Sequence, residues 1–172
     1  MELQRGEVLF LQEEQGELFR LRSGLLKVVR IQEDGSQLLF NILVPGEVFP
    51  HHSLITPKEY YGSVIAMLSS QLERIPAEEW YKDLEQDPKK YKEVALLLQN
   101  TIRQMQQRIE MTRVAIELRI PLFRKWLAIY CPHHPVEDLL TQEEIGQFLG
   151  MSRETVNRLL RKERKQEKNE EI

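Results

Sequence analysis

Hydrophobic residues in the first 75 positions follow the pattern of short strands joined by tight turns. The segment from Leu18 to Val48 is rich in Leu, Val, Ile and Phe, and Gly24, Gly35 and Gly46 interrupt it at intervals of eleven residues. This spacing is typical of antiparallel strands connected by short hairpins. Residues 62–75 are expected to add one or two further strands. The N-terminal half should therefore form a small β-barrel or sandwich.

The pattern becomes helical after residue 75. Pro76 is expected to open a short helix, since proline is favourable in a first helical turn, and Pro88 to close it. A long helix should follow from about Lys89 to about Arg119. We expect Ile120-Pro121 to interrupt it, residues 122–130 to resume it, and two prolines to keep residues 131–135 in a loop.

The long helix carries a narrow apolar seam. Its members are spaced 4, 3, 4, 3 and 4 residues apart, with isoleucine at every a position of a heptad: Leu98, Ile102, Met105, Ile109, Thr112 and Ile116. β-branched residues at a favour a parallel two-stranded coiled coil. The alternative is that this face packs on the protein's own barrel. Polar neighbours keep the seam narrow, which favours dimerisation.

Residues 140–161, LTQEEIGQFLGMSRETVNRLLR, predict two short helices joined by a sharp turn. Thr141 and Glu144 have the spacing of a capping box at the start of the first helix. Gly150 can adopt the left-handed conformation that ends it, and Ser152 can cap the second helix. This arrangement predicts a helix-turn-helix.

Composition narrows the functional classes. The chain has 172 residues, is 41% hydrophobic and 30% charged, and contains one cysteine, Cys131, which excludes an internal disulfide framework or an all-cysteine cluster. It has no apolar run of the roughly 18 residues that span a membrane, and no secretion signal at its start, so a cytoplasmic protein is expected. The net charge is −3, yet residues 152–165 carry six basic and two acidic side chains. A polyanion would bind there.

The second predicted helix begins with side chains of the types that contact DNA bases. A helix in the major groove presents its N-terminal residues to base edges. Arg153 and Arg158 could each donate two hydrogen bonds to guanine, and Glu154 could accept one from cytosine. The Ser152 and Thr155 hydroxyls suit phosphate oxygens. The alternative is an ordinary solvated charged face, but a glutamate among arginines favours base readout.

The strings QEEIG and GMSRETVNR in residues 142–158 closely resemble the helix-turn-helix of the Crp/Fnr superfamily of bacterial transcription regulators. The resemblance covers nearly the whole chain. It implies an α+β fold with an N-terminal β-roll of the cyclic-nucleotide-binding type (a double-stranded β-helix), a long dimerisation helix and a C-terminal helix-turn-helix. The corresponding segments are residues 1–88, 89–119 and 120–172.

The resemblance also implies function. Such a regulator binds a palindromic operator in double-stranded DNA as a homodimer, is not an enzyme, and has RNA polymerase as a further candidate partner. By this comparison Arg153, Glu154 and Arg158 would read bases, whereas Thr141, Gln142, Ser152 and Thr155 would contact phosphates.

Three departures from the superfamily pattern limit the resemblance. The phosphate cassette of nucleotide-binding members has a Gly-Glu pair and an Arg-Ser/Thr pair, but here these positions read Pro50-His51 and residues 60–63, with no arginine between Arg30 and Arg74. We therefore expect that cyclic AMP is not the effector, which stays unidentified. One cysteine is too few for the oxygen-sensing branch. The polar residues after Arg161 are also unlike the β-hairpin wing, and the usual N-terminal helix is missing, so a regulator trimmed at both ends is expected.

Two other functions stay open. A small cupin-like metal-binding protein or enzyme would need spaced histidines, but the histidines form adjacent pairs, His51-His52 and His133-His134, so no metal or cofactor is expected. The second alternative function is that of a wingless regulator, which dimerises without binding DNA. Tyr60 and Tyr61, with Phe49 and Trp80, are candidates for a small apolar pocket, although core packing is the commoner role.

Overall fold

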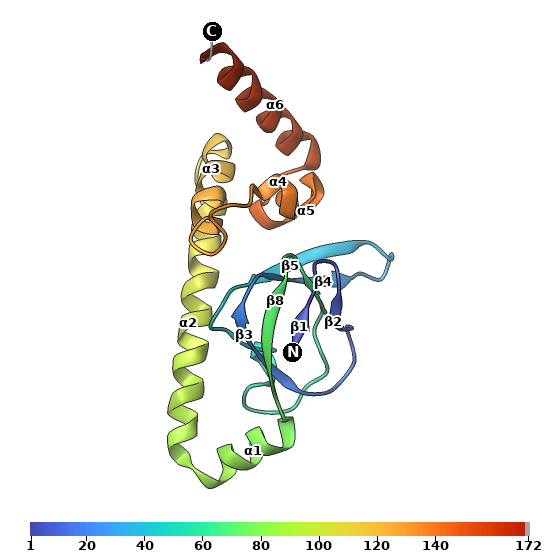
Figure 1. The fold of residues 1–172 in the computed structure, drawn as a ribbon, viewed down its shortest axis with the longest axis vertical. Helices are drawn as coiled ribbons and strands as arrows, with labels where there is room; N and C mark the ends of the chain where they lie inside the picture. The colour runs from blue at the N-terminus through green and yellow to red at the C-terminus, as the bar shows by residue number, and fades with distance from the viewer. Residues whose placement is uncertain (171–172) are drawn as a thin grey trace. The chain divides into compact units, whose positions relative to one another are not determined.

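The computed structural model describes the backbone of residues 1–170, together with the side chains of all of these except 164 and 166–170. It divides into two compact units, of which the first covers Met1–Gln107 and the second begins at Arg108. The ribbon of the whole chain is drawn in Figure 1.

The first unit is built on two four-stranded antiparallel sheets, as the glycine spacing predicts. One sheet has the order β1-β8-β3-β6 and the other β2-β7-β4-β5. The strands are β1 (Glu2–Leu3), β2 (Val8–Phe10), β3 (Leu18–Ser23), β4 (Leu26–Ile31), β5 (Gln37–Leu43), β6 (Val48–Phe49), β7 (Ser63–Ala66) and β8 (Ser70–Ile75). Gly24, Gly35 and Gly46 all have positive φ, which confirms them as turn residues.

Two hydrophobic clusters hold this β-roll and its helices together. The first lies between the sheets and includes Phe10, Phe19, Phe49 and Tyr60. The second joins the roll to α1 (Ala77–Gln86) and to the start of α2 (Pro88–Arg113) through Trp80 and other side chains. The Trp80 indole donates a hydrogen bond to the Leu54 carbonyl over 2.8 Å, so α1 is fixed by a directional bond as well as by apolar packing.

The long helix ends earlier than predicted. It stops at Arg113, and α3 (Ile116–Leu127) begins after a break at Val114 and Ala115. The predicted interruption at Ile120-Pro121 is wrong, because Pro121 lies inside α3. Pro121 is the sixth residue of α3, and it removes one intrahelical hydrogen bond without ending the helix. The two helices are separated instead at Ala115, whose ψ of 141° is extended.

The second unit contains α3, a one-turn helix α4 (Val136–Leu139), α5 (Gln142–Leu149) and α6 (Arg153–Glu170). Its core is aromatic, with the Phe123 and Phe148 rings stacked 4.8 Å apart. Arg124 on α3 pairs with Glu137 and, over 2.9 Å, with Glu163. These ion pairs connect α3 to α4 and α6. The last two residues of the predicted polar tail lie outside the described residues.

Candidate nucleic-acid interface

Helix α5 begins at the predicted capping box. The Thr141 hydroxyl accepts a hydrogen bond from the Glu144 backbone N–H over 3.2 Å, and the Glu144 carboxylate accepts one from the Thr141 N–H over 2.9 Å. The flanking Leu140 and Ile145 are both buried, as expected of a hydrophobic staple. Local sequence therefore fixes where α5 begins, independently of the rest of the fold.

Two glycines shape the turn between α5 and α6. Gly150 ends α5 in the left-handed region, with φ of 66° and ψ of 46°. Gly146 is required for a different reason, because a Cβ atom at this position would lie 2.5 Å from the Met151 carbonyl oxygen. The turn can thus pass directly against α5, which brings the start of α6 close to its partner helix.

Helix α6 is capped by Ser152, whose hydroxyl accepts a hydrogen bond from the Thr155 N–H over 3.2 Å. Val156, Leu159 and Leu160 are buried on its inner face. With this face fixed by packing, Arg153, Glu154 and Arg158 are left exposed. The predicted base-reading residues therefore lie together on the outer face of the first two turns.

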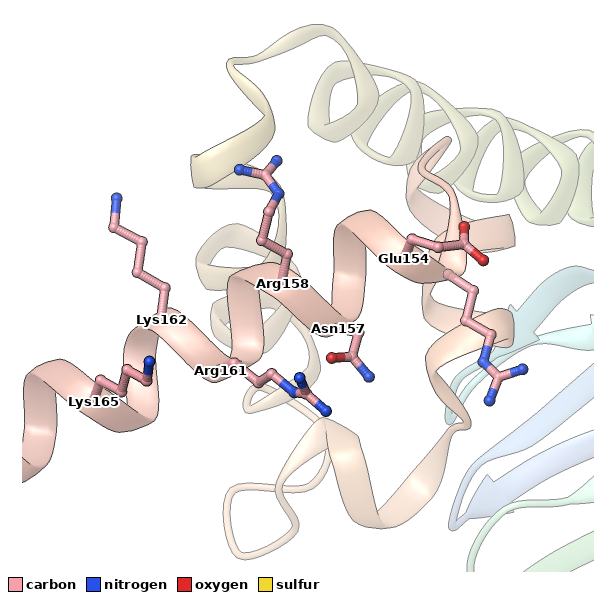
Figure 2. A pocket seen from close by; sticks show the side chains of 7 residues that line it. Glu154, Asn157, Arg158, Arg161, Lys162 and Lys165 are labelled. Carbon is pink, nitrogen blue, oxygen red and sulfur yellow. The ribbon is translucent and has the colours of Figure 1, made fainter.

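This outer face is strongly basic and slightly hollowed. An open depression of about 700 Å³ is lined by seven residues of α6: Arg153, Glu154, Asn157, Arg158, Arg161, Lys162 and Lys165. Figure 2 shows Arg158 and Lys162 projecting on one side of the helix and Asn157 and Arg161 on the other. Glu154 is the acidic member of this set. A hydrogen bond from its own backbone N–H, followed by one from Ser152 and by the charge of Arg153, lowers the pKa of its carboxyl.

The four residues expected at phosphates lie at the starts of the two helices. The Ser152 and Thr155 hydroxyls are 3.1 Å apart and hydrogen-bonded to each other. Gln142 accepts a hydrogen bond from the Asn157 amide over 2.9 Å, which ties the start of α5 to α6. Thr141 serves as the α5 cap. The Thr141 hydroxyl hydrogen and the Gln142 amide NH₂ are not used in these bonds, whereas in the Ser152–Thr155 pair one hydroxyl donates its hydrogen to the other.

Arg119 is a part of the site that the sequence does not predict. Its Nη1 donates hydrogen bonds to the carbonyl oxygens of Leu149, at 3.0 Å, and Gly150, at 2.9 Å, and its Nε donates to Val114 at 3.2 Å. The side chain therefore binds both the turn of the helix-turn-helix and the break before α3. No local sequence signal points to this role, because two of the partners are carbonyls about thirty residues away.

The aromatic residues and the cysteine that the sequence singles out lie mostly in the packed interior. Tyr60 is a core residue, with its ring 3.8 Å from that of Phe10 and its hydroxyl donating to the Glu17 carbonyl. Trp80 also packs in the core, whereas Tyr61 and Phe49 do line a cavity. Cys131 is buried, which raises the pKa of its thiol. Within the described residues, no three His, Cys, Asp or Glu side chains come together as a metal site.

Comparison with known proteins finds a matching protein family for each of the two units. The family profile described as the cyclic nucleotide-binding domain matches residues 1–87, and that described as the Crp-like helix-turn-helix domain matches residues 122–168. The chain belongs to the Crp/Fnr family of transcription regulators. Membership in this family identifies it as a regulator and not an enzyme, so the cupin-like alternative is wrong. None of the helices within residues 1–170 has the length and hydrophobicity needed to cross a membrane.

Several proteins of known name or structure are similar to most of this chain. The transcriptional activator protein anr of Pseudomonas aeruginosa is 27% identical over 91% of this chain and 67% of its own length. The cyclic AMP receptor protein of Thermus thermophilus is 26% identical over 91% of this chain and 72% of its own length. Among solved structures, a CRP-family transcriptional regulator from Thermus thermophilus has the same fold, with a TM-score of 0.76 and 22% identity over 96% of this chain and 85% of that one.

Proposed function

We propose that two copies of this chain bind a palindromic DNA operator, each inserting the start of α6 into a major groove. The observation that carries the proposal is the exposed trio Arg153, Glu154 and Arg158 at the start of a helix whose opposite face is buried. A recognition helix contacts base edges with its N-terminal residues. The trio occupies those positions.

Each member of the trio has a distinct role in this proposal. Arg153 and Arg158 donate paired hydrogen bonds to O6 and N7 of guanine. Glu154 accepts a hydrogen bond from the amino group of cytosine. The Glu154 carboxylate is ionised at neutral pH, as an ordinary glutamate is. An ionised carboxylate can only accept hydrogen bonds, so it discriminates against bases that present no donor.

The four residues at the helix starts orient the protein on the DNA backbone. Thr141, Gln142, Ser152 and Thr155 are proposed to donate to phosphate oxygens. Thr141 and Gln142 would use hydrogens that their present bonds leave free, and the Ser152–Thr155 pair would exchange its mutual hydrogen bond for one to phosphate. Lys162 and Lys165, further along the same basic face, add charge toward the backbone. Contacts of this kind set position and contribute affinity without reading sequence.

The seam on α2 is proposed to join the two copies. Ile102, Met105 and Ile109 are 56%, 41% and 51% exposed, which is unusual for three apolar residues in register on one helix. Leu98 is half-buried against the roll, and the Thr112 hydroxyl bonds back to the Ile109 carbonyl over 2.7 Å. Ile116 is the first residue of α3, beyond the helix break, so its place in the seam stays a prediction that a continuous helix does not support.

Other parts of the proposal concern regulation. Cyclic AMP is the ligand in the name of the Thermus thermophilus relative, but for this chain we propose a different effector, since no arginine lies between Arg30 and Arg74 to neutralise a cyclic phosphate. RNA polymerase is a proposed partner at promoters, and the cytoplasm is the proposed location.

Selection of bound duplexes from a random DNA pool tests the proposal. The wild-type chain should enrich a two-fold symmetric sequence, and Arg153→Ala should lose preference at one base pair per half-site, a loss of about 1–3 kcal/mol in discrimination. Arg103→Ala, an exposed arginine of α2, is the matched control and should select the wild-type sequence. Equal weakening on all sequences would make Arg153 a backbone contact. Absence of any enrichment at low salt would favour a dimer that does not bind DNA.

A further inference from the structure

The β-roll contains a cavity of about 290 Å³ that is not part of the DNA-binding face. Aromatic side chains form much of its lining, namely Phe10, Phe40, Phe49 and Tyr61. They pack with one another at its edges, with ring centroids 5.0 Å apart for Phe40 and Tyr61 and 6.3 Å apart for Phe10 and Phe49. Aliphatic residues, including Leu43 and Val64, complete the walls.

Three polar side chains at this cavity, those of Tyr61, His52 and His51, already contact other groups of the protein. The Tyr61 hydroxyl accepts a hydrogen bond from Arg30 over 2.6 Å, and the guanidinium lies 3.9 Å from the centre of the same ring. The His52 Nε2 is 2.9 Å from the Glu59 carbonyl oxygen. The His51 Nε2 is 2.8 Å from the Glu47 carboxylate. Few polar groups are therefore left to bind a polar ligand.

The charge around the cavity disfavours an anion. Within the residues that the structure describes, no lysine or arginine lines the cavity. Behind His51 lies the carboxylate of Glu47, which is only 4% exposed and accepts a hydrogen bond from the Val44 N–H. An anion brought into this site would lose its hydration, and the Arg30 guanidinium beside Tyr61 is already bonded to the Tyr61 hydroxyl and is not among the lining residues. The residues present do not fit a cyclic nucleotide, the ligand after which the matching domain is described.

We infer that this cavity binds a compact, uncharged aromatic molecule. The volume is at the lower limit of the range of roughly 300–1,000 Å³ typical of small-molecule sites, which restricts the ligand to one or two fused rings. Aromatic walls stabilise an aromatic guest through offset and edge-to-face contacts. Asn41, on β5, is the lining residue with an amide that can bond a single hydroxyl or carbonyl of the guest.

Met105 connects this cavity to the proposed dimer seam. It is a lining residue contributed by α2 and one of the exposed seam residues. A ligand in the cavity would therefore contact the helix that is proposed to pair the two copies. The role of the cavity as an effector site rests on the proposed function, whereas ligand binding itself does not.

The test compares 2-naphthol, which is uncharged at neutral pH, with 2-naphthoate, which has the same ring system and a negative charge. Isothermal titration calorimetry with the full chain should show 2-naphthol binding at least about tenfold more tightly than 2-naphthoate, with no binding of cyclic AMP. Tyr61→Ala should weaken 2-naphthol binding several-fold. Tyr91→Ala is the matched control, since Tyr91 is 47% exposed and Tyr61 45%, but Tyr91 does not line the cavity.

A second variant distinguishes loss of the binding site from loss of the fold, because it is expected to gain binding of one of the two probes. Asn41→Arg places a cation at the cavity and should reverse the preference, so that 2-naphthoate binds better than 2-naphthol. Equal binding of the two probes by the wild-type chain, binding of cyclic AMP, or no binding of 2-naphthol would overturn the inference. Operator binding by the same preparations separates the two proposals. Normal DNA binding without 2-naphthol binding rejects only the cavity ligand, and the opposite result rejects only the DNA-binding function.

Discussion

Arg119 Nη1 donates a hydrogen bond to the carbonyl oxygen of Gly150 over 2.9 Å, and thereby ties α3 to the turn between the two helices of the DNA-binding motif. The same side chain binds Leu149 and Val114. One guanidinium thus satisfies carbonyls at the end of α5 and at the helix break after Arg113. This is the contact expected to hold the angle of the recognition helix within its own unit.

Replacing the Arg119 side chain should lower the stability of the chain. We expect Arg119→Ala to lower the free energy of unfolding of the full chain by about 2–3 kcal/mol, since several hydrogen bonds from a charged donor are removed together. Urea unfolding followed by circular dichroism measures the change. Arg113→Ala, an exposed arginine in the last turn of α2, should change stability by less than about 0.5 kcal/mol. Equal effects of the two substitutions would mean that the Arg119 hydrogen bonds contribute nothing specific.

The lysines of the basic face should contribute to affinity without changing sequence preference. Lys162→Ala and Lys165→Ala are each expected to reduce the slope of log affinity against log salt by about 0.9 for every phosphate that the variant no longer neutralises. Fluorescence anisotropy with the selected operator at several salt concentrations measures that slope. Lys89→Ala is the control and should leave the salt slope unchanged, because Lys89 lies in the first turn of α2, far in sequence from the DNA-binding helices. A selective effect on one operator sequence would instead assign the lysine to base recognition.

The seam can be tested by introducing a charge. Ile109→Asp should raise the dimer dissociation constant by at least about 100-fold, because two carboxylates would be buried against each other at a paired a position. Size-exclusion chromatography with light scattering measures the molar mass. Ile129→Asp is the control, because Ile129 is 72% exposed and lies outside α2. A wild-type chain that is monomeric at high micromolar concentration would contradict the proposal that the seam joins two copies.

The pH dependence of stability should depend in part on Glu17. Its carboxylate accepts hydrogen bonds from Arg74 over 2.7 Å and from the Ala77 N–H over 2.6 Å, and these bonds, with that from Arg74 the larger cause, lower its pKa. A lowered folded-state pKa gives a stabilisation that is present above the ordinary carboxyl pKa and is lost as pH falls through the folded-state value.

Glu17→Gln should therefore cost about 0.5–1 kcal/mol near neutral pH, and the difference from wild type should shrink as the solution is acidified. Thermal unfolding across the acidic range measures this convergence. The exposed Glu33 provides a control substitution, Glu33→Gln, which should show no such trend. A constant difference at all pH values would mean that the charge of Glu17 is not what matters.

The features that sequence predicts best are those whose cause is local. The ends of α5 and the start of α6 depend on Thr141, Gly150 and Ser152, each of which acts within four residues of its own position. The same holds for the glycine turns of the roll. A short polar side chain or a glycine at such a position determines the backbone directly, so the pattern predicts these elements correctly.

The features that sequence predicts wrongly depend on residues far apart in the chain. The rule that proline interrupts a helix predicts a break at Pro121, yet the break lies at residues 114–115, where the Val114 carbonyl is bound by Arg119. The cavity is another example, since adjacent Tyr60 and Tyr61, in the segment before β7, have opposite roles: Tyr60 packs in the core against Phe10 and Tyr61 lines the cavity. Neither outcome has a local signal.

Met105 lies on α2 at a point shared by the cavity lining and the apolar seam. Thermodynamic reciprocity requires that two events linked through one side chain alter each other's equilibrium constant by the same factor. A guest molecule that strengthens pairing of the helices is therefore held more tightly by paired chains than by single ones. The concentration of the regulator would then determine how strongly it responds to a given amount of the small molecule.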